Sequence, residues 1–351
     1  MNNRLIIADI KSNNNNGICT GHYYAFAANY QNIFRTRCEV KIASGPIYRK
    51  KFKGEDMIML PCDYIVGDSK FKNIIRMLHN GWNLFALTKK DDVIILQQSQ
   101  PAMILFTLLL TCFGRRNIYQ VQYSSEPMRR FYYRIMFYLK RKYFKGILCP
   151  NDEVGRAYGI PYLVLPDYIY IGTYASDWLS YDSKKYDFCS VGRITGGKGI
   201  SETVSVMAGK PYSMIIAGQA QDTKEESTIK KYIMGCSNID LKMKYITDDK
   251  YKEYISSSRY SILNYQEEYS DHSSGVVFDF LFNGVPVIAR RCKSLQFIED
   301  NHLGLLYDNI QDVDFSSLLN NDFYVGYINS IKNYCDSFRK HINNLTEFLE
   351  I

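Results

Sequence analysis

Residues 187–207, DFCSVGRITGGKGISETVSVM, contain the pattern that most clearly indicates the fold of this chain. The short run Asp187–Val191 predicts a strand, and Ile200–Met207 is expected to form a helix. The turn between them, Gly192–Gly199, contains four glycines, which allow a tight connection. A strand, a short glycine-rich turn and a helix together indicate a parallel sheet covered by helices.

The same alternation extends over both halves of the chain. In the second half the expected strands are 213–217, 241–246, 260–264 and 287–289, and the expected helices are 224–232, 250–256 and 276–282. In the first half we expect strands at 5–10, 40–43, 64–66, 93–96 and 118–121, helices at 22–35, 72–79 and 103–110, and a loop over the polar residues 11–21. We therefore predict an α/β fold of two doubly wound domains.

The length of 351 residues also suits two domains. We place the N-terminal domain at 1–172, a polar linker at 173–185 and the second domain at 186–323. The remaining residues, 324–351, have the pattern of one or two long helices, and one option is that they cross back to the first domain.

The composition excludes several other classes of protein. Nine scattered cysteines without a CxxC pair argue against a zinc site and a disulfide framework, and they suit a reducing cytoplasm. The longest apolar run lies within Pro101–Phe113, which is shorter than the ~20 residues of a membrane-spanning helix. A net charge of +7, from 43 basic and 36 acidic residues, does not by itself imply a nucleic-acid partner.

The glycine-rich turn is the first candidate site. Small residues let the backbone approach a bound group, and a helix N-terminus presents free N–H groups to anionic oxygens. Arg193 and Lys198 add two cations, so we expect a diphosphate ligand; the alternative is a structural turn with two solvated charges. A P-loop would need Ser or Thr at Gly199, and no GxGxxG follows the first strand. A P-loop NTPase and a dinucleotide-binding dehydrogenase are therefore both disfavoured.

The second candidate site is the segment Tyr265–Ala289, YQEEYSDHSSGVVFDFLFNGVPVIA. Ser274 and Gly275 stand at the expected helix start, where serine is a good N-cap and backbone amides can bind phosphate. Asp279 lies one turn further, within an apolar stretch, where its carboxylate can bind a pair of sugar hydroxyls; a structural acid is the alternative. Asp271 competes for a place in the site with two neighbouring glutamates.

In this order, the motifs resemble those of GT-B glycosyltransferases, in particular the large retaining family 4. The resemblance rests on GRIxxxKG after the first strand of the second domain, on two acids separated by seven residues, and on NGVPVIA and FIEDNHLGLLY. It is clear over residues 186–310 and only architectural over residues 1–170. It implies an α/β fold of two Rossmann-like domains facing a cleft, the GT-B architecture, in which the second domain binds a nucleotide-sugar donor and the first meets the acceptor.

The resemblance also implies roles for individual residues. Arg193, Lys198 and Asp271 would form the catalytic set: the two cations bind the donor diphosphate, and the acid lies near the donor sugar. Asp279 would bind the nucleotide ribose. The residues expected at the phosphates are Gly192, Ser274, Gly275 and Val276. The family usually has glutamate where this chain has the two aspartates, so each carboxylate is one methylene shorter here.

On the acceptor side, the resemblance points to the glycine-containing loop near the N-terminus. Gly17, Gly21 and His22 stand in and at the end of this loop, and an ordinary helix-start residue is the alternative for His22. The family often has a histidine at the end of a strand of the first domain. The comparable positions here are Gln97 or Gln122, which hydrogen-bond but do not exchange protons.

A basic and aromatic segment occupies residues 128–145, MRRFYYRIMFYLKRKYFK. It holds seven cations and no acid, with seven aromatic residues among them. We expect a basic amphipathic helix that contacts an anionic membrane surface. An ordinary helix with its aromatic face in the core is the alternative, and RNA binding has no supporting motif.

Together these features predict a glycosyltransferase that moves a sugar from a nucleotide-sugar to a glycan or polyprenyl-linked acceptor, by front-face transfer with retention. No metal or other cofactor is expected, since Arg193 and Lys198 supply the positive charge. Analogy and the basic segment suggest bacterial surface polysaccharide assembly, by a cytoplasmic enzyme that is peripheral at the inner face of the plasma membrane. The alternatives are another GT-B activity, such as an inverting transferase or an epimerase, and a degenerate nucleotide-binding subunit.

Overall fold

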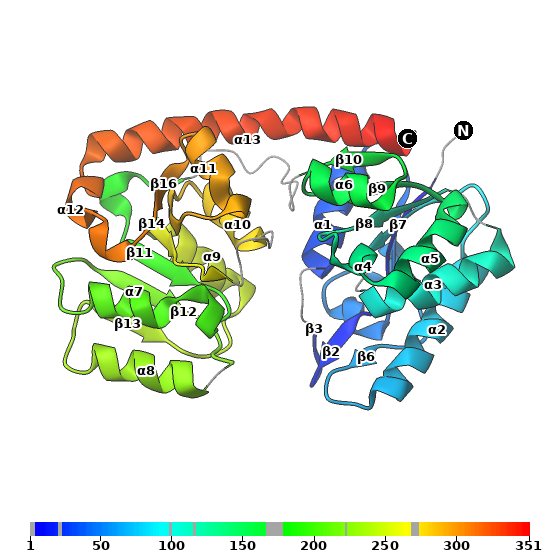
Figure 1. Ribbon diagram of the computed structural model, residues 1–351, viewed down its shortest axis with the longest axis horizontal. Helices are drawn as coiled ribbons and strands as arrows, with labels where there is room; N and C mark the ends of the chain where they lie inside the picture. Colours follow the sequence, from blue (N-terminus) through cyan, green and yellow to red (C-terminus); the bar gives the residue numbers. More distant parts are fainter. Residues whose placement is uncertain are drawn as a thin grey trace. The chain divides into compact units, whose positions relative to one another are not determined.

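The computed structural model describes residues 4–19, 23–97, 100–114, 117–165, 178–221, 223–267 and 274–351, without the side chains of 100–105. The chain divides into two compact units (Figure 1). Unit 1 consists of Met1–Ile171 and Arg339–Ile351, and unit 2 consists of Gly172–Phe338. Each unit is built on a large parallel sheet connected through helices, so the predicted fold class of two Rossmann-like domains is confirmed.

The large sheet of unit 1 has seven parallel strands in the order β10–β9–β8–β7–β1–β4–β5. β1 and β7 lie in its interior and are buried along their whole length, because helices cover both faces. The strands are β1 Leu5–Asp9, β4 Val40–Ser44, β5 Met57–Met59, β7 Val93–Gln97, β8 Ile118–Val121, β9 Phe144–Cys149 and β10 Tyr162–Val164.

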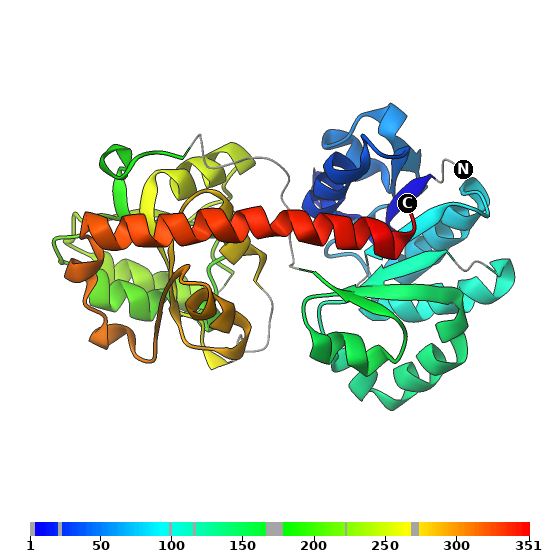
Figure 2. The ribbon, with the colours of Figure 1, turned by 90° about the horizontal axis from the view of Figure 1, so that it is seen from above.

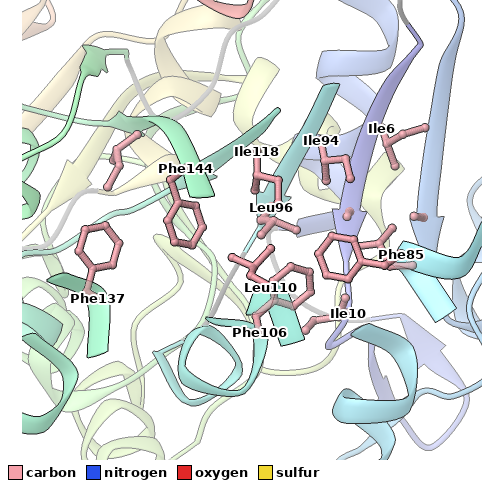
Figure 3. Packing of buried hydrophobic residues seen from close by; sticks show 14 of the residues in the cluster. Ile6, Ile10, Phe85, Ile94, Leu96, Phe106, Leu110, Ile118, Phe137 and Phe144 are labelled. Carbon is pink, nitrogen blue, oxygen red and sulfur yellow. The ribbon is translucent and has the colours of Figure 1, made fainter. Parts of the chain in front are cut away.

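Two clusters of apolar side chains form the core of unit 1, one on each face of the sheet. Ile6 of β1 packs in the first cluster with Phe85, Phe106 and Phe137 from three helices (Figure 3). Ile7 points to the opposite face and belongs to the second cluster, because side chains alternate along a strand. The helices of this part are α1 Tyr23–Phe34, α2 Lys70–Leu87, α3 Gln100–Phe113, α4 Glu126–Arg129, α5 Phe131–Lys140 and α6 Asp152–Tyr158.

The expectation of a plain loop after the first strand is wrong, because a small hairpin forms there. β2 (Asn13–Asn15) pairs antiparallel with β3 (Ile18–Cys19) and parallel with β6 (Tyr64–Ile65). Asn16 and Gly17 have φ angles of 50° and 78°. These left-handed values are those of an Asn-Gly hairpin turn, which is a strong sequence pattern for a hairpin.

The basic segment expected as one helix over 128–145 is also different. It comprises the end of α4, all of α5, a short 3-10 turn at Arg141–Tyr143 and the first two residues of β9. Phe144 is buried and pairs with Ile118 of β8. The interpretation as a single helix is therefore wrong, because the last two residues of the segment belong to a strand of the sheet.

The sheet of unit 2 has six parallel strands in the order β13–β12–β11–β14–β15–β16. Phe188 and Ile262 of the two middle strands lie in the main apolar cluster of the unit. The strands are β11 Tyr186–Val191, β12 Met214–Ala217, β13 Ile239–Lys242, β14 Ser258–Leu263, β15 Val287–Arg290 and β16 Gly304–Tyr307. The helices are α7 Ile200–Met207, α8 Thr223–Ile233, α9 Asp248–Ser256, α10 Gly275–Phe282, α11 Gln296–Asp300 and α12 Phe315–Leu318.

The last helix, α13 (Asn321–Leu349), is one continuous helix (Figure 2). Tyr324 in its first turn belongs to the core of unit 2, whereas Leu345 and Leu349 belong to the core of unit 1. The hydroxyl of Tyr119 on β8 donates a 2.9 Å hydrogen bond to the carbonyl oxygen of Phe348. The C-terminal residues therefore complete the unit that the N-terminal residues begin. No described helix combines the length and the apolar character needed to cross a membrane.

Candidate functional site

The strand order of unit 2 places the candidate site at the carboxyl ends of β11 and β14. After β11 the chain builds β12 and β13 on one side, and then returns to the other side with β14. Such a reversal leaves a crevice outside the carboxyl ends of the two strands, where open α/β sheets bind ligands. A small pocket lies there, lined among others by Gly192, Lys198 and Tyr265.

The glycine-rich turn requires glycine at two positions. Gly192 has a φ of 124° and Gly199 a φ of 59°, values that other residues rarely adopt. A Cβ atom on Gly199 would also lie 2.2 Å from the carbonyl oxygen of Asn264. The backbone of the turn can therefore approach β14 closely before α7 begins.

Two residues that follow β14, Asn264 and Gln266, hold the glycine-rich turn in place by hydrogen bonds. The side-chain amide of Asn264 donates to the carbonyl oxygen of Gly199 at 3.2 Å, and the backbone N–H of Gln266 donates to that of Gly197 at 2.9 Å. The carboxylate of Glu202, in the first turn of α7, accepts from both side-chain amides at 2.9 and 3.1 Å. The sequence pattern does not reveal these contacts, because the partners are more than 60 residues apart.

Arg193 and Lys198 stand in this turn with no counter-ion among the described residues. Within the described part of the chain, neither side chain makes an ion pair or a hydrogen bond. The Lys198 ammonium lies 3.5 Å from the position that a Cβ atom on Gly192 would occupy, and Arg193 is exposed. Burial, and then the charge of Arg193, lower the pKa of Lys198 to about 8. A bound anion would relieve the repulsion between the two cations, so the turn favours an anionic ligand.

Thr195 is a third polar group of the turn, which the sequence analysis did not single out. Its hydroxyl oxygen is buried and has no hydrogen-bond partner among the described residues. Buried polar atoms without a partner are uncommon and costly, so a ligand oxygen is a natural partner for this hydroxyl. The pattern that could have revealed it is a hydroxyl residue between two cations in a glycine-rich turn.

The start of α10 lies beside the same turn. Val276 Cγ2 is 3.8 Å from the position of a Cβ atom on Gly192. Ser274 is the N-cap residue, as expected, but its hydroxyl makes no capping bond and instead lies 2.6 Å from the hydroxyl of Tyr265. The structure thus brings the glycine-rich turn and the start of α10 together.

Of the two candidate acids, Asp279 and Asp271, only Asp279 lies within the described residues. Asp279 is half-buried, and its carboxylate accepts a 2.8 Å hydrogen bond from the hydroxyl of Tyr251 on α9. Asp271 lies outside the described residues, as do Gly21 and His22 of the acceptor side. Among the residues that are described, no three His, Cys, Asp or Glu side chains are grouped so that they could hold a metal ion.

Unit 1 has a strand reversal of its own, between β1 and β7. Asp9 ends β1, and its buried carboxylate accepts from the Tyr48 hydroxyl at 2.7 Å and from the Lys11 backbone N–H at 3.0 Å. Burial raises the pKa of Asp9 to about 6. Gln97 ends the neighbouring strand β7; it is buried, and neither atom of its amide has a partner within the described part of the chain.

The other acceptor-side residues lie in different elements of unit 1. Gly17 is in the turn of the β2–β3 hairpin, where its N–H donates to Asn14 Oδ1 at 2.8 Å. Gln122 directly follows β8 and is buried. Of the two glutamines considered in the sequence analysis, Gln97 is the one at the strand reversal, where a ligand is expected.

Solved structures share this fold, whereas no protein-family model matches the sequence and no curated protein is significantly similar to it. A glycosyltransferase from Rickettsia africae has a TM-score of 0.68 at 15% identity, and HepE of Anabaena, in complex with UDP and glucose, has 0.66 at 12%. Both matches cover 99% of each chain. A UDP-forming α,α-trehalose-phosphate synthase from Burkholderia xenovorans, in complex with glucose-6-phosphate, has 0.61 at 10% and covers 99% of this chain and all of that one. The fold is therefore that of GT-B glycosyltransferases.

Proposed function

We propose that the chain is a glycosyltransferase that moves a sugar from a nucleotide-sugar donor to a glycan or lipid-linked acceptor. The observation that carries this proposal is the pair Arg193 and Lys198, two cations without a described counter-ion at the strand reversal of unit 2. A nucleoside diphosphate has the charge and the extent to engage both. The fold supports the same conclusion, because similar structures hold UDP and glucose or glucose-6-phosphate.

The proposed chemistry follows from the charge that develops during transfer. Breaking the bond between the sugar and the diphosphate leaves further negative charge on the leaving phosphate oxygen. Lys198, Arg193 and the N–H groups at the start of α10 would stabilise that charge most strongly in the transition state. The acceptor oxygen bonds to the anomeric carbon from the same face, and its proton goes to the leaving phosphate oxygen. This front-face route retains the anomeric configuration, as in the retaining family 4.

Recognition of the rest of the donor would fall to the two acids. Asp279 lies one helical turn beyond Gly275, so a ribose attached to a diphosphate at the start of α10 would come within its reach. Its carboxylate accepts hydrogen bonds from two vicinal hydroxyls in this proposal. Asp271 is assigned to the donor sugar by the resemblance alone. Because two side-chain cations already face the diphosphate, the scheme needs no divalent metal.

The proposed setting is bacterial surface polysaccharide assembly on a lipid-linked acceptor. In that setting the enzyme would work in the cytoplasm, at the inner face of the plasma membrane. The support is the resemblance in the second half of the chain and the basic, aromatic surface that α5 and the residues after it give to unit 1.

The test is turnover with a panel of nucleotide-sugars and simple glycan acceptors. We expect one donor to raise the melting temperature, since a ligand that binds only the folded state stabilises it. The same donor should release its nucleoside diphosphate in the presence of an acceptor, and NMR of the product should show the donor's anomeric configuration. An inverted product would contradict the front-face mechanism. Binding without any transfer or hydrolysis would instead identify a degenerate nucleotide-binding subunit.

A further inference from the structure

The outer surface of unit 1 carries a concentration of exposed apolar side chains. α2 packs on α3, and α3 packs on α5, so that the three helices form a layer on one face of the sheet (Figure 1). Ten of the eighteen large hydrophobic side chains that are exposed among the described residues lie on these three helices. We call their outer surface the three-helix face.

The exposed side chains are arranged in stripes. Phe71, Ile75 and Trp82 are four and seven residues apart along α2, so they share one side of that helix. Phe131 and Tyr138 are seven residues apart on α5 and share a side in the same way. Phe71 is 72% exposed and Phe131 is 68% exposed.

These exposed side chains do not belong to the core. The opposite side of α5 packs in the core instead. Tyr133 and Phe137 of α5 are buried in the cluster shown in Figure 3. Leu108 on α3 is exposed between the two outer helices. Exposed apolar surface of this extent on a soluble domain marks an interaction site.

The three helices themselves carry only positive charges, although Asp68, just before α2, pairs with Arg76 and with Lys72. The segments Lys70–Leu87, Gln100–Phe113 and Phe131–Tyr143 contain no Asp or Glu. Arg76 is neutralised by Asp68 at 2.8 Å, but Arg141 lies over the ring of Tyr138, at 4.2 Å from its centroid. A cation stacked on an exposed aromatic ring is an arrangement suited to the boundary between lipid headgroups and acyl chains.

We propose that the three-helix face docks on the surface of an anionic lipid bilayer. The aromatic and aliphatic side chains enter the headgroup boundary, while the surrounding lysines and arginines bind lipid phosphates. Charge complementarity selects this occupant over a second copy of the chain, because two such faces would bring like charges together. The sequence analysis expected membrane contact through residues 128–145 alone, whereas this proposal gives α2 an equal share of the contact with the bilayer. It does not rest on the proposed transferase activity.

The experiment is co-sedimentation of the full chain with phosphatidylcholine vesicles, prepared with and without phosphatidylglycerol. The parent should bind only the anionic vesicles, and added salt should release it. The double variant Arg141→Glu/Lys142→Glu should bind at least about tenfold more weakly, because each basic residue near such a surface contributes about fivefold. Phe71→Ser/Ile75→Ser on α2 should weaken binding to a similar degree. The matched controls, Phe323→Ser and Lys231→Glu, remove an exposed apolar group and a cation from unit 2 and should bind like the parent.

Three results would overturn the inference. Parent-like binding by the α2 double variant would confine the membrane contact to α5. Equal binding to neutral and anionic vesicles would show that the basic side chains do not bind lipid phosphates. A parent dimer in light scattering that Phe71→Ser/Ile75→Ser dissociates would make the face a protein interface. Melting curves and nucleoside-diphosphate binding of every variant distinguish these results from misfolding and from failure of the proposed donor site, which lies in unit 2.

Discussion

The hydroxyl of Tyr251 donates a 2.8 Å hydrogen bond to the carboxylate of Asp279, and this bond links α9 to α10. The acid that we assign to the ribose therefore also has a partner within unit 2. A structural role of this carboxylate would affect the stability of unit 2, whereas a ligand-binding role would affect nucleotide affinity, and two substitutions distinguish these roles.

Asp279→Asn should lower the affinity for the nucleotide by roughly 1–2 kcal/mol, because it removes a charge-assisted contact. Its melting temperature without ligand should change little, since the amide oxygen can still accept from Tyr251. Tyr251→Phe is the matched control: it keeps the carboxylate, should lower the free energy of unfolding by about 1 kcal/mol, and should bind nucleotide like the parent. Calorimetric titration and melting curves measure both quantities. If Asp279→Asn binds normally but melts well below the parent, Asp279 is a structural acid only.

The affinity for a nucleoside diphosphate should fall as the pH rises through about 8, where Lys198 loses its proton. The charged lysine is the form that binds, so affinity should be greatest below this pKa. Between pH 7 and pH 9 the loss should be about tenfold if the charge is required for binding. Lys198→Arg keeps its charge over this range and should make the affinity nearly independent of pH. Titrations at several pH values provide the comparison; a parallel decline in both proteins would remove Lys198 from the binding equilibrium.

Turnover should persist in excess EDTA, because Arg193 and Lys198 supply the positive charge at the diphosphate in our scheme. The measurement is the release of nucleoside diphosphate before and after chelation, followed by addition of magnesium or manganese. Complete loss of activity that either metal restores would contradict the scheme.

Gln97→Leu should leave the melting temperature equal to that of the parent or higher. Both amide atoms of Gln97 are buried without a described partner. Burying such a group destabilises the folded state, because its lost hydrogen bonds to water are not replaced, and an apolar side chain avoids this loss. The same change should lower kcat/KM for the acceptor by about tenfold or more, if the amide binds an acceptor hydroxyl. Nucleoside-diphosphate affinity is the internal control and should not change. Unaltered acceptor kinetics would leave Gln97 without a role in the acceptor site.

The fold was predictable where a strand is a local apolar run between turns. Ile118–Val121 in unit 1 agrees with the sequence-based expectation, and Ile200–Met207 in unit 2 agrees as well. β9 (Phe144–Cys149) was missed altogether, because its first residues, Phe144 and Lys145, continue a series of aromatic and basic residues, and only pairing with β8 assigns them to the sheet. The β2–β3 hairpin was missed although Asn16-Gly17 is a local turn pattern, because β2 consists of asparagines alone and β3 has only two residues.

The site was predictable only in its local part. The glycine-rich turn with Arg193 and Lys198 is visible in eight consecutive residues, whereas the amides that fix it come from residues 264 and 266, beyond three further strands. The hydrogen bond between Tyr251 and Asp279 spans 28 positions and follows no helical or strand period. Such contacts depend on how strands and helices stack, which a pattern along the chain does not contain.

In our proposal, the glycine-rich turn binds the diphosphate of a nucleotide-sugar. The most direct test is calorimetric titration of nucleoside diphosphates into the parent, Arg193→Ala, Lys198→Ala and the exposed control Lys210→Ala. The parent and Lys210→Ala should bind the same nucleotide equally well. Each of the other two variants should bind at least about tenfold more weakly, since each loses a charge-assisted contact, while melting like the parent. Equal affinity in all four proteins would show that the turn does not bind the diphosphate.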